Sequence, residues 1–239
     1  MFKIFTPYIN LIALFSLKQD GPMKITDDQR NFNNREVFIK KNNIGTDNLF
    51  IGRLKHTNNV VIVKDRSINM FYDCDGLITN LPNVYLSFTI ADCTAIYIFD
   101  PVNNVIGLLH AGWKGLRDDI IKNAMNLMKE QYSSNERDIL VGISPLICDK
   151  CYEVQKDFID NFKNYPEAFI QKNDKTYFDS KYVLLKKLSE LDIKKQNIEF
   201  IDECTYCLKD KYFSYRRDQY GCHPDDINAM MAVFGLKNN

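Results

Sequence analysis

Five short apolar runs between residues 60 and 143 restrict the possible folds of this chain more than any other feature. They are rich in β-branched, aliphatic and aromatic side chains, and Asp, Asn, Pro or Gly residues separate them. The runs are Val60–Val63, Val84–Ile90, Ala95–Phe99, Val105–His110 and Ile139–Ile143. Such runs are typical of buried strands, and Pro101–Asn104 is typical of a hairpin connection between two of them.

Apolar residues at helical spacing lie around these strands. The clearest helix is predicted at Gly115–Tyr132, with Asp118 and Asp119 in its first turn and Lys129 in its last. Further elements are predicted as helices at Val154–Tyr165, Ser180–Leu191 and Asp226–Leu236, strands within Leu11–Leu17 and at Asn197–Ile201, and a loop with a short helix in Lys18–Asn48. We therefore expect an α/β fold: a single domain over residues 1–239 with mixed β-sheets flanked by helices, as in an α/β sandwich.

Charge and cysteine content narrow the class of partner. Lys plus Arg and Asp plus Glu both number 31, so we expect neither a nucleic acid nor a membrane partner, and a small ligand is favoured. Pro7 and Asn10 interrupt the apolar N-terminus, and no signal-peptide cleavage site follows. The seven cysteines are an odd number, which favours a reducing, cytoplasmic location. The sequence leaves open whether the protein is a monomer or a homodimer.

The densest chemical signal runs from Thr89 to Gly115. If its two strands form a hairpin, Cys93 and His110 lie at the same end of the sheet. His56, just before a strand, adds a second imidazole, and two His with one Cys make a zinc site with an open position. The glycines at 112 and 115 begin a helix whose free N–H groups can bind an anion beside that site. The alternative is that Cys93 and His110 are ordinary buried residues.

Four other charged residues are candidates for the same site. Asp75 and Asp92 can orient a ligand histidine or act as a general base, although either can instead cap a turn. Arg216 and Arg217 follow an aromatic stretch, where a guanidinium can bind phosphate and a ring can stack on a purine. The alternative is an edge strand with one arginine in a salt bridge, and strand alternation would point only one of the two toward the site.

Six motifs occur in the order seen in one known family. They are Asp73–Thr79, Ala91–Cys93, His110–Gly115, Cys151–Val154, Cys204-Thr205 and Phe213–Asp218. On these motifs the chain resembles the laccase-domain polyphenol oxidoreductase family, whose members are described mainly as zinc-dependent purine nucleoside phosphorylases with adenosine deaminase activity. In two places the chain departs from the family's pattern: Leu54–Thr57 stands for Gln-Val-His-Gly, and Leu17–Gly21 for Thr-Arg-x-Gly-Gly.

The resemblance implies a function and a set of site residues. It implies phosphorolysis of adenosine, inosine and methylthioadenosine together with adenosine deamination, so a purine nucleoside and phosphate are the expected partners. It places the zinc ligands on His56, Cys93 and His110. We expect Cys93, His110 and Asp92 to be catalytic. We expect Arg216, Arg217 and Lys114 to bind substrate.

Three other functions stay open. Cys93 can be a nucleophile with His110 as its base in an amidase that edits a peptidoglycan precursor, as some relatives are described, or zinc can serve that amidase. With only three histidines the chain cannot hold the three sites of a multicopper laccase, but a single Cu²⁺ with weak polyphenol oxidase activity remains possible. The third is a binding module in which zinc is structural.

Four cysteines form two CxxC pairs, Cys148 with Cys151 and Cys204 with Cys207. This pattern is typical of a four-thiolate structural zinc site, but the 52 residues between the pairs are far more than in compact zinc ribbons. The alternative is that Cys151 and Cys204 are only family-typical positions. Cys74, Cys222 and His223 have no assigned role.

Overall fold

The apolar runs of the sequence form two mixed β-sheets that lie face to face. A computed structural model describes residues 2–25, 28–219 and 228–238. The first sheet has the order β1 (Leu11–Phe15), β14 (Met230–Leu236), β6 (Tyr85–Ile90), β2 (Leu49–Arg53) and β4 (Met70–Tyr72). The second has the order β13 (Ile198–Phe200), β9 (Leu140–Ile143), β7 (Thr94–Asp100), β8 (Val105–Ala111), β5 (Gly76–Thr79) and β3 (Val60–Ile62).

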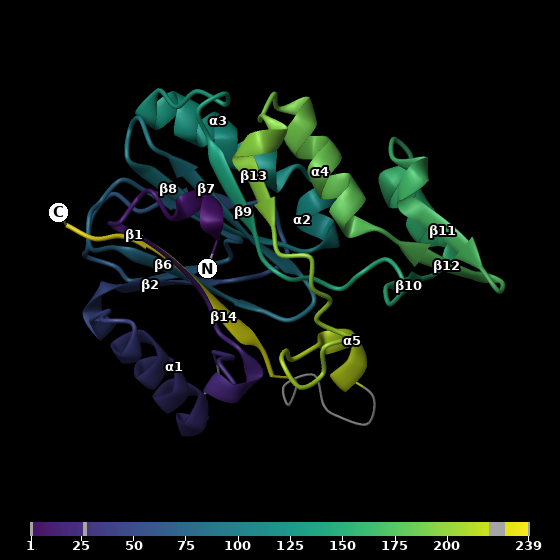
Figure 1. Ribbon diagram of the computed structural model, residues 1–239, viewed down its shortest axis with the longest axis horizontal. Coiled ribbons are helices and arrows are strands. Elements are labelled where there is room, and N and C mark those ends of the chain that lie inside the picture. The colour runs from purple at the N-terminus through teal and green to yellow at the C-terminus, as the bar shows by residue number, and fades with distance from the viewer. Residues whose placement is uncertain (1, 26–27, 220–227, 239) are drawn as a thin grey trace.

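Helices cover the outer faces of the two sheets (Figure 1). They are α1 (Gln29–Lys41), α2 (Trp113–Arg117), α3 (Ile120–Tyr132) and α4 (Ser180–Glu190). A further short helix, α5 (Tyr215–Asp218), lies before β14 in the chain. The 3-10 helices are η1 (Lys3–Phe5), η2 (Lys18–Asp20), η3 (Thr46–Asn48), η4 (Lys156–Phe162), η5 (Pro166–Ala168) and η6 (Lys195–Asn197). A small third sheet of β10 (Glu153–Val154), β12 (Lys175–Phe178) and β11 (Phe169–Lys172) projects from the body.

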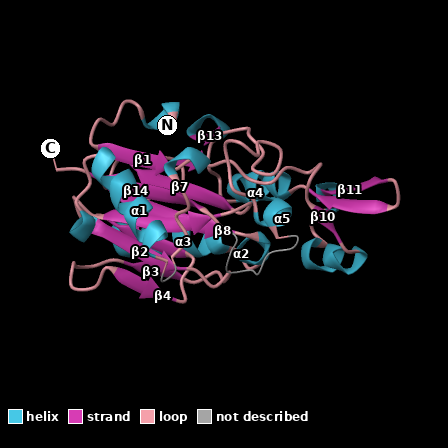
Figure 2. Cartoon of the chain, turned by 90° about the horizontal axis from the view of Figure 1, so that it is seen from below, coloured by secondary structure: helices cyan, strands magenta, loops and turns pink. Residues whose placement is uncertain are grey.

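Buried apolar clusters hold these layers together. Between the sheets, aromatic rings from both sides interlock, and the Tyr97 and Phe234 rings meet edge to face with centroids 5.2 Å apart. On the far side of the six-stranded sheet, α2, α3 and α4 bury their apolar faces. Helix α1 lies over the five-stranded sheet (Figure 2), and its Phe38 and Ile39 pack on the outer face of that sheet. The layering confirms the predicted α/β class with mixed sheets flanked by helices.

The five predicted runs are strands β3, β6, β7, β8 and β9. Strands β7 and β8 pair as a hairpin across Pro101–Asn104, with Asp100 opposite Val105 at the turn. Helix α4 and strands β1 and β13 also lie where the sequence predicts them. A helix lies within Lys18–Asn48 as predicted, but α1 has 13 residues and is longer than the short helix expected there.

Three predicted helices differ in the structure. The Gly115–Tyr132 helix was wrong as a continuous element: α2 begins at Trp113, and Asp119, at a left-handed φ of 62°, separates it from α3. The α-helix predicted at Val154–Tyr165 was also wrong. The chain there forms the end of β10 and then the 3-10 helix η4, whose Phe158 ring packs against the Phe178 ring.

The helix at Asp226–Leu236 was also wrong. All seven residues of β14 are buried between β1 and β6, so its continuous apolar run is that of a central strand. Residues 226 and 227 of this prediction lie outside the described residues.

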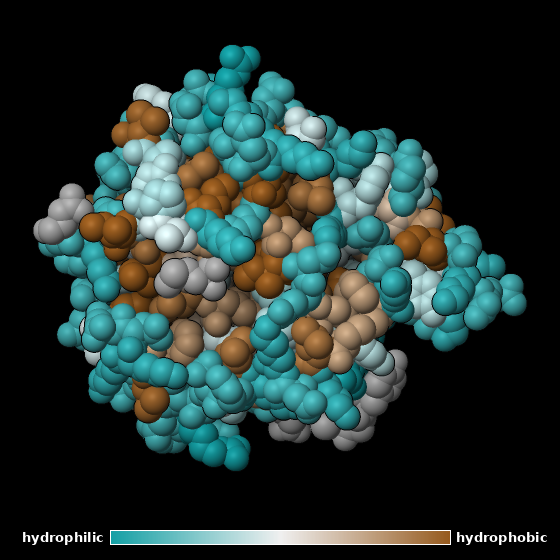
Figure 3. Space-filling model, viewed as in Figure 1, coloured by the Kyte–Doolittle hydropathy of each residue, from teal (hydrophilic) through white to brown (hydrophobic). Residues whose placement is uncertain are grey.

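The surface in the view of Figure 3 is mostly hydrophilic, including the tip of the β11–β12 hairpin. Within the described ranges, no helix has both the length and the apolar character that crossing a membrane requires.

Candidate metal centre and adjoining pocket

Three metal-binding side chains converge at one end of the β7–β8 hairpin. Cys93 immediately precedes β7, and His110 lies near the end of β8, where it pairs with Ala95. His56 comes from the loop between β2 and β3, where its φ of 58° turns the chain toward the other two. One ligand atom from each residue lies within 4.8 Å of the other two. The hairpin thus brings thiol and imidazole together as the sequence predicts.

Asp75 orients both histidines. It immediately precedes β5, and Oδ1 lies 2.8 Å from Nδ1 of His110. The same carboxylate accepts the backbone N–H groups of Lys55 at 3.1 Å, His56 at 3.0 Å and Thr57 at 2.8 Å. Because Nδ1 of His110 is engaged, Nε2 is the ring nitrogen that remains for a metal.

The surroundings of the site favour the charged forms of Cys93, His110 and Asp75. Burial alone would raise the pKa of Cys93, but His110 and His56 lower it to about 6. Burial would lower the pKa of His110, but Cys93 and Asp75 raise it to about 9. Burial would likewise raise the pKa of Asp75, and the hydrogen bonds it accepts from His110 and Thr57 lower it to about 2. The negative charge on Cys93 and Asp75 suits a cation at the histidines.

Gly112 leaves space among the three ligands. A Cβ atom built on it would lie 2.9 Å from Sγ of Cys93, 3.5 Å from Cδ2 of His56 and 3.8 Å from Cε1 of His110. A side chain here would therefore occupy the centre of the trio. With one thiolate, two imidazoles and no side chain between them, the residues fit a zinc ion that keeps an open position. The same donor set accepts copper.

A pocket opens beside this trio. It is lined by His56, Ala91, Asp92, Cys93, Thr94, Ala111, Trp113, Leu116, Leu146, Ile147, Tyr152, Ser180, Tyr215 and Arg216. The Arg216 guanidinium lies 5.1 Å from the centroid of the Tyr152 ring, and its Nη1 donates to the Glu153 carbonyl at 2.5 Å. The pocket therefore combines aromatic walls, a cationic group and two of the three metal-binding side chains, those of His56 and Cys93.

The two arginines at 216 and 217 have different surroundings. The Arg217 guanidinium donates to the backbone carbonyls of Thr205, Tyr206 and Tyr212, at 2.9 Å each. Arg216 is the one that lines the pocket. Both lie on the short helix α5 rather than on an edge strand.

Asp92 and Lys114 also have distinct positions. The buried Asp92 carboxylate accepts hydrogen bonds from Thr205 Oγ1 at 2.6 Å, Ser214 Oγ at 2.9 Å and the Arg216 backbone N–H at 2.6 Å. Burial raises its pKa, against these hydrogen bonds. Asp92 therefore positions α5 beside the pocket, while Asp75 orients His110. Lys114 lies 5.6 Å from the Trp113 ring and does not line the pocket.

Several pocket residues carried no chemical signal in the sequence. Leu146 and Ile147 come from one segment and Ser180 from another, and only the fold brings the two segments together. Tyr152 and Tyr215 stand inside the family motifs, and that was the signal available for them. The four cysteines of the two CxxC pairs are also brought together, with all four Sγ atoms within 4.8 Å of one another. Cys222 and His223 lie outside the described residues.

Comparisons with known proteins agree with this architecture. A purine nucleoside phosphorylase of Borreliella burgdorferi is 34% identical over 210 residues, covering 81% of this chain and 89% of that protein. A purine nucleoside phosphorylase of Clostridium acetobutylicum is 33% identical over 172 residues, covering 70% and 71%. The hypothetical protein YfiH of Bacillus licheniformis superposes with a TM-score of 0.87 at 27% identity, over 95% of this chain and 93% of that one. Residues 20–226 match the family model described as multi-copper polyphenol oxidoreductase laccase, and the chain belongs to this family.

Proposed function

We propose that the protein is a zinc-dependent purine nucleoside phosphorylase. One observation carries the proposal: His56, Cys93 and His110 converge at the edge of a pocket that His56 and Cys93 line together with Arg216 and Tyr152. Relatives at 33–34% identity are named for that activity. The substrates are a purine nucleoside and inorganic phosphate, and the products are the free base and ribose 1-phosphate.

Arg216 is the group that binds phosphate. Within the described residues its guanidinium makes one hydrogen bond, to the Glu153 carbonyl, so its other N–H groups can donate to phosphate oxygens. The Arg216 backbone N–H donates to the Asp92 carboxylate at 2.6 Å, and this contact fixes the position of Arg216 beside the pocket.

The aromatic residues position the nucleoside. Tyr152, Tyr215 and Trp113 line the pocket and offer faces on which a purine can stack. In phosphorolysis a phosphate oxygen forms a bond to C1′ of the ribose, the C1′–N9 bond breaks, and its electron pair leaves with the base. Arg216 keeps the incoming phosphate close to the sugar, while the rings hold the leaving base.

A zinc ion held by His56, Cys93 and His110 would supply an electrophile or an activated water at the open position. Asp75 is hydrogen-bonded to Nδ1 of His110 and so leaves Nε2 as the ring nitrogen that would bind the metal. Such a water would also supply the oxygen for the proposed deamination of adenosine, in which a C6–O bond forms, the C6–N bond breaks and the exocyclic amine leaves as ammonia. We propose adenosine, inosine and methylthioadenosine as substrates, and a cytoplasmic location in keeping with the cysteine content.

The test is base release from adenosine, inosine and methylthioadenosine by protein of known zinc content, with and without phosphate. We expect release that requires phosphate and is lost in Cys93→Ala, and inosine formation from adenosine without phosphate. A Lys129→Ala variant, changed on the surface of α3, serves as the control. Protein with one zinc at the trio that turns over none of the three nucleosides contradicts the proposal.

The Cys93–His110 pair also favours a second candidate, a cysteine-dependent amidase acting on a peptidoglycan precursor. A thiol whose pKa is lowered beside an imidazole is a nucleophile with its base. In that case iodoacetamide inactivates metal-free protein, and added zinc does not restore the activity. Measuring the copper content together with the zinc content tests a further alternative, a single-copper polyphenol oxidase.

A further inference from the structure

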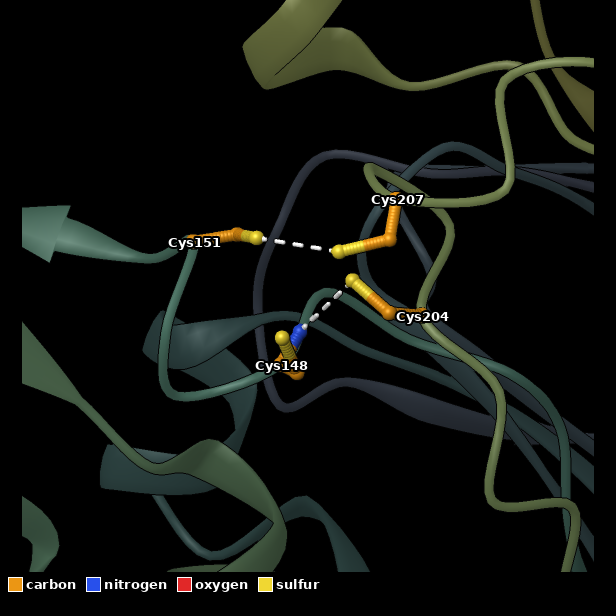
Figure 4. Close-up of side chains that lie close together, drawn as sticks. All are labelled: Cys148, Cys151, Cys204 and Cys207. Carbon is orange, nitrogen blue, oxygen red and sulfur yellow. Dashed lines mark hydrogen bonds between the residues drawn. The ribbon is translucent and has the colours of Figure 1, made fainter.

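Four cysteine side chains from two distant CxxC pairs meet beside the pocket (Figure 4). Cys148 and Cys151 lie in the loop between β9 and β10, and Cys204 and Cys207 lie in the loop after β13. We propose that this cysteine quartet binds a second zinc ion, which clamps the two loops together. The site is separate from the His56, Cys93 and His110 trio and uses none of its residues.

The spacing of the sulfur atoms fits a single ion. All four Sγ atoms lie within 4.8 Å of one another, and those of Cys151 and Cys207 are 3.3 Å apart. Four thiolates at about 2.3 Å from one tetrahedral zinc lie about 3.8 Å from each other. The quartet therefore needs only small side-chain movements to close around an ion. All four cysteines are free thiols in the structure.

Each pair is presented by a tight turn of the backbone. The Cys151 N–H donates to the Cys148 carbonyl at 3.0 Å, and the Leu208 N–H donates to the Cys204 carbonyl at 3.1 Å. These turns place both sulfurs of a pair on the same side. The Cys148 N–H also donates to Sγ of Cys204 at 3.3 Å, a contact that stabilises a thiolate ligand.

The backbone preforms the site. Leu146 and Cys204 form an isolated parallel bridge, and the Thr205 N–H donates to the Leu146 carbonyl at 3.2 Å. The two loops are therefore already in register before a metal binds. Four protein ligands leave no open position, so the proposed ion is structural and does not take part in the reaction.

Both loops that carry the cysteine quartet form hydrogen bonds with Asp92, which lines the pocket. The Ile147 N–H donates to the Asp92 carbonyl at 3.1 Å, and Thr205 Oγ1 donates to its carboxylate at 2.6 Å. One loop thus holds the backbone of Asp92 and the other its side chain. Cys93 is the next residue, so the quartet fixes the entry to β7 from two sides.

The test is the zinc content of the full-length protein, purified without added metal under reducing conditions. We expect two zinc ions per chain in the wild type, one in Cys151→Ser/Cys207→Ser, and one in Cys93→Ser. Cys74→Ala, which removes a buried thiol outside both groups, should keep two. A wild type with one zinc that is lost in Cys93→Ser and retained in the double variant overturns the proposal.

Cobalt substitution decides the question even if the double variant fails to fold. In Cys93→Ser, one Co²⁺ should show the intense thiolate charge-transfer bands of a four-sulfur tetrahedral site. Absence of these bands overturns the proposal, as does a Cys151–Cys207 disulfide found by mass spectrometry in anaerobically prepared wild type. These readouts need no substrate, so a failure of the proposed phosphorolysis leaves them unchanged.

Discussion

Asp75 Oδ1 lies 2.8 Å from Nδ1 of His110, and both side chains are buried. The same carboxylate accepts the backbone N–H of His56. One residue outside the proposed ligand set therefore fixes the ring of one ligand and the loop of another. Residues 75 and 110 are 35 positions apart, and the antiparallel pairing of β5 with β8 brings them together.

Replacing Asp75 should weaken metal binding. In Asp75→Asn the carboxylate charge is lost, and an amide cannot hold both the His110 ring and the backbone N–H groups equally well. Loss of such a partner typically lowers metal affinity about 10–100-fold. Zinc affinity measured by chelator competition checks this. Asp100→Asn is the control, because Asp100 is also buried but lies at the opposite end of the β7–β8 hairpin. Equal zinc affinity of Asp75→Asn and wild type would show that Asp75 does not support the site.

The same residue predicts a pH dependence of stability. The pKa of Asp75 is about 2 in the folded chain, below its value of about 3.9 in an unfolded one. A carboxyl group with a lowered folded-state pKa stabilises the fold above pH ~4 and loses that contribution as the pH falls toward 2. The difference in unfolding free energy between wild type and Asp75→Asn should therefore shrink between pH 5 and pH 3, measured by urea denaturation. A constant difference would contradict the assignment.

Gly112 offers a steric test of the centre. In Gly112→Ala the new Cβ lies 2.9 Å from Sγ of Cys93, so the thiol must move away from the histidines. We expect zinc affinity to fall by about 10-fold or more, as for other disturbances of ligand geometry. Gly107→Ala in β8, the strand that ends just before Gly112, is the control, because the nearest contact of its new Cβ would be an ordinary 3.5 Å. If Gly112→Ala binds zinc as Gly107→Ala does, the ion does not lie among the three side chains.

Local sequence patterns predicted the elements that form from contacts between residues near in the chain. The β7–β8 hairpin follows from two apolar runs and a Pro-Asn turn, and its register alone brings Cys93 next to His110. Strand β14 could not be predicted in this way. Its continuous apolar run fits a buried helix or a central strand, and the pairing with β1 and β6 that decides between them is long-range.

The site shows the same division. The three proposed ligands follow from residue type and hairpin geometry, whereas the contact of Asp75 with His110 depends on how β5 pairs in the sheet. The break before α3 arises because Asp119 adopts a left-handed φ, which propensity alone does not require. The two CxxC pairs suggested a four-thiolate site, whereas the 52 residues between Cys151 and Cys204 argued against one. The pairing of β13 beside β9 brings the two pairs together.

Arg216 and Arg217 should respond differently to substitution. Arg216 lines the pocket, whereas Arg217 donates to three backbone carbonyls near Thr205. Removing a charge-assisted hydrogen bond costs about 1.5–3 kcal/mol, so Arg216→Ala should raise the KM for phosphate roughly 10- to 100-fold with little change in Tm. Arg217→Ala should instead lower Tm, because it leaves those carbonyls without a donor. Steady-state kinetics at varied phosphate and thermal melts measure both effects. If Arg217→Ala raises the phosphate KM at unchanged Tm and Arg216→Ala does not, Arg217 is the phosphate ligand and the assignment of the two residues is reversed.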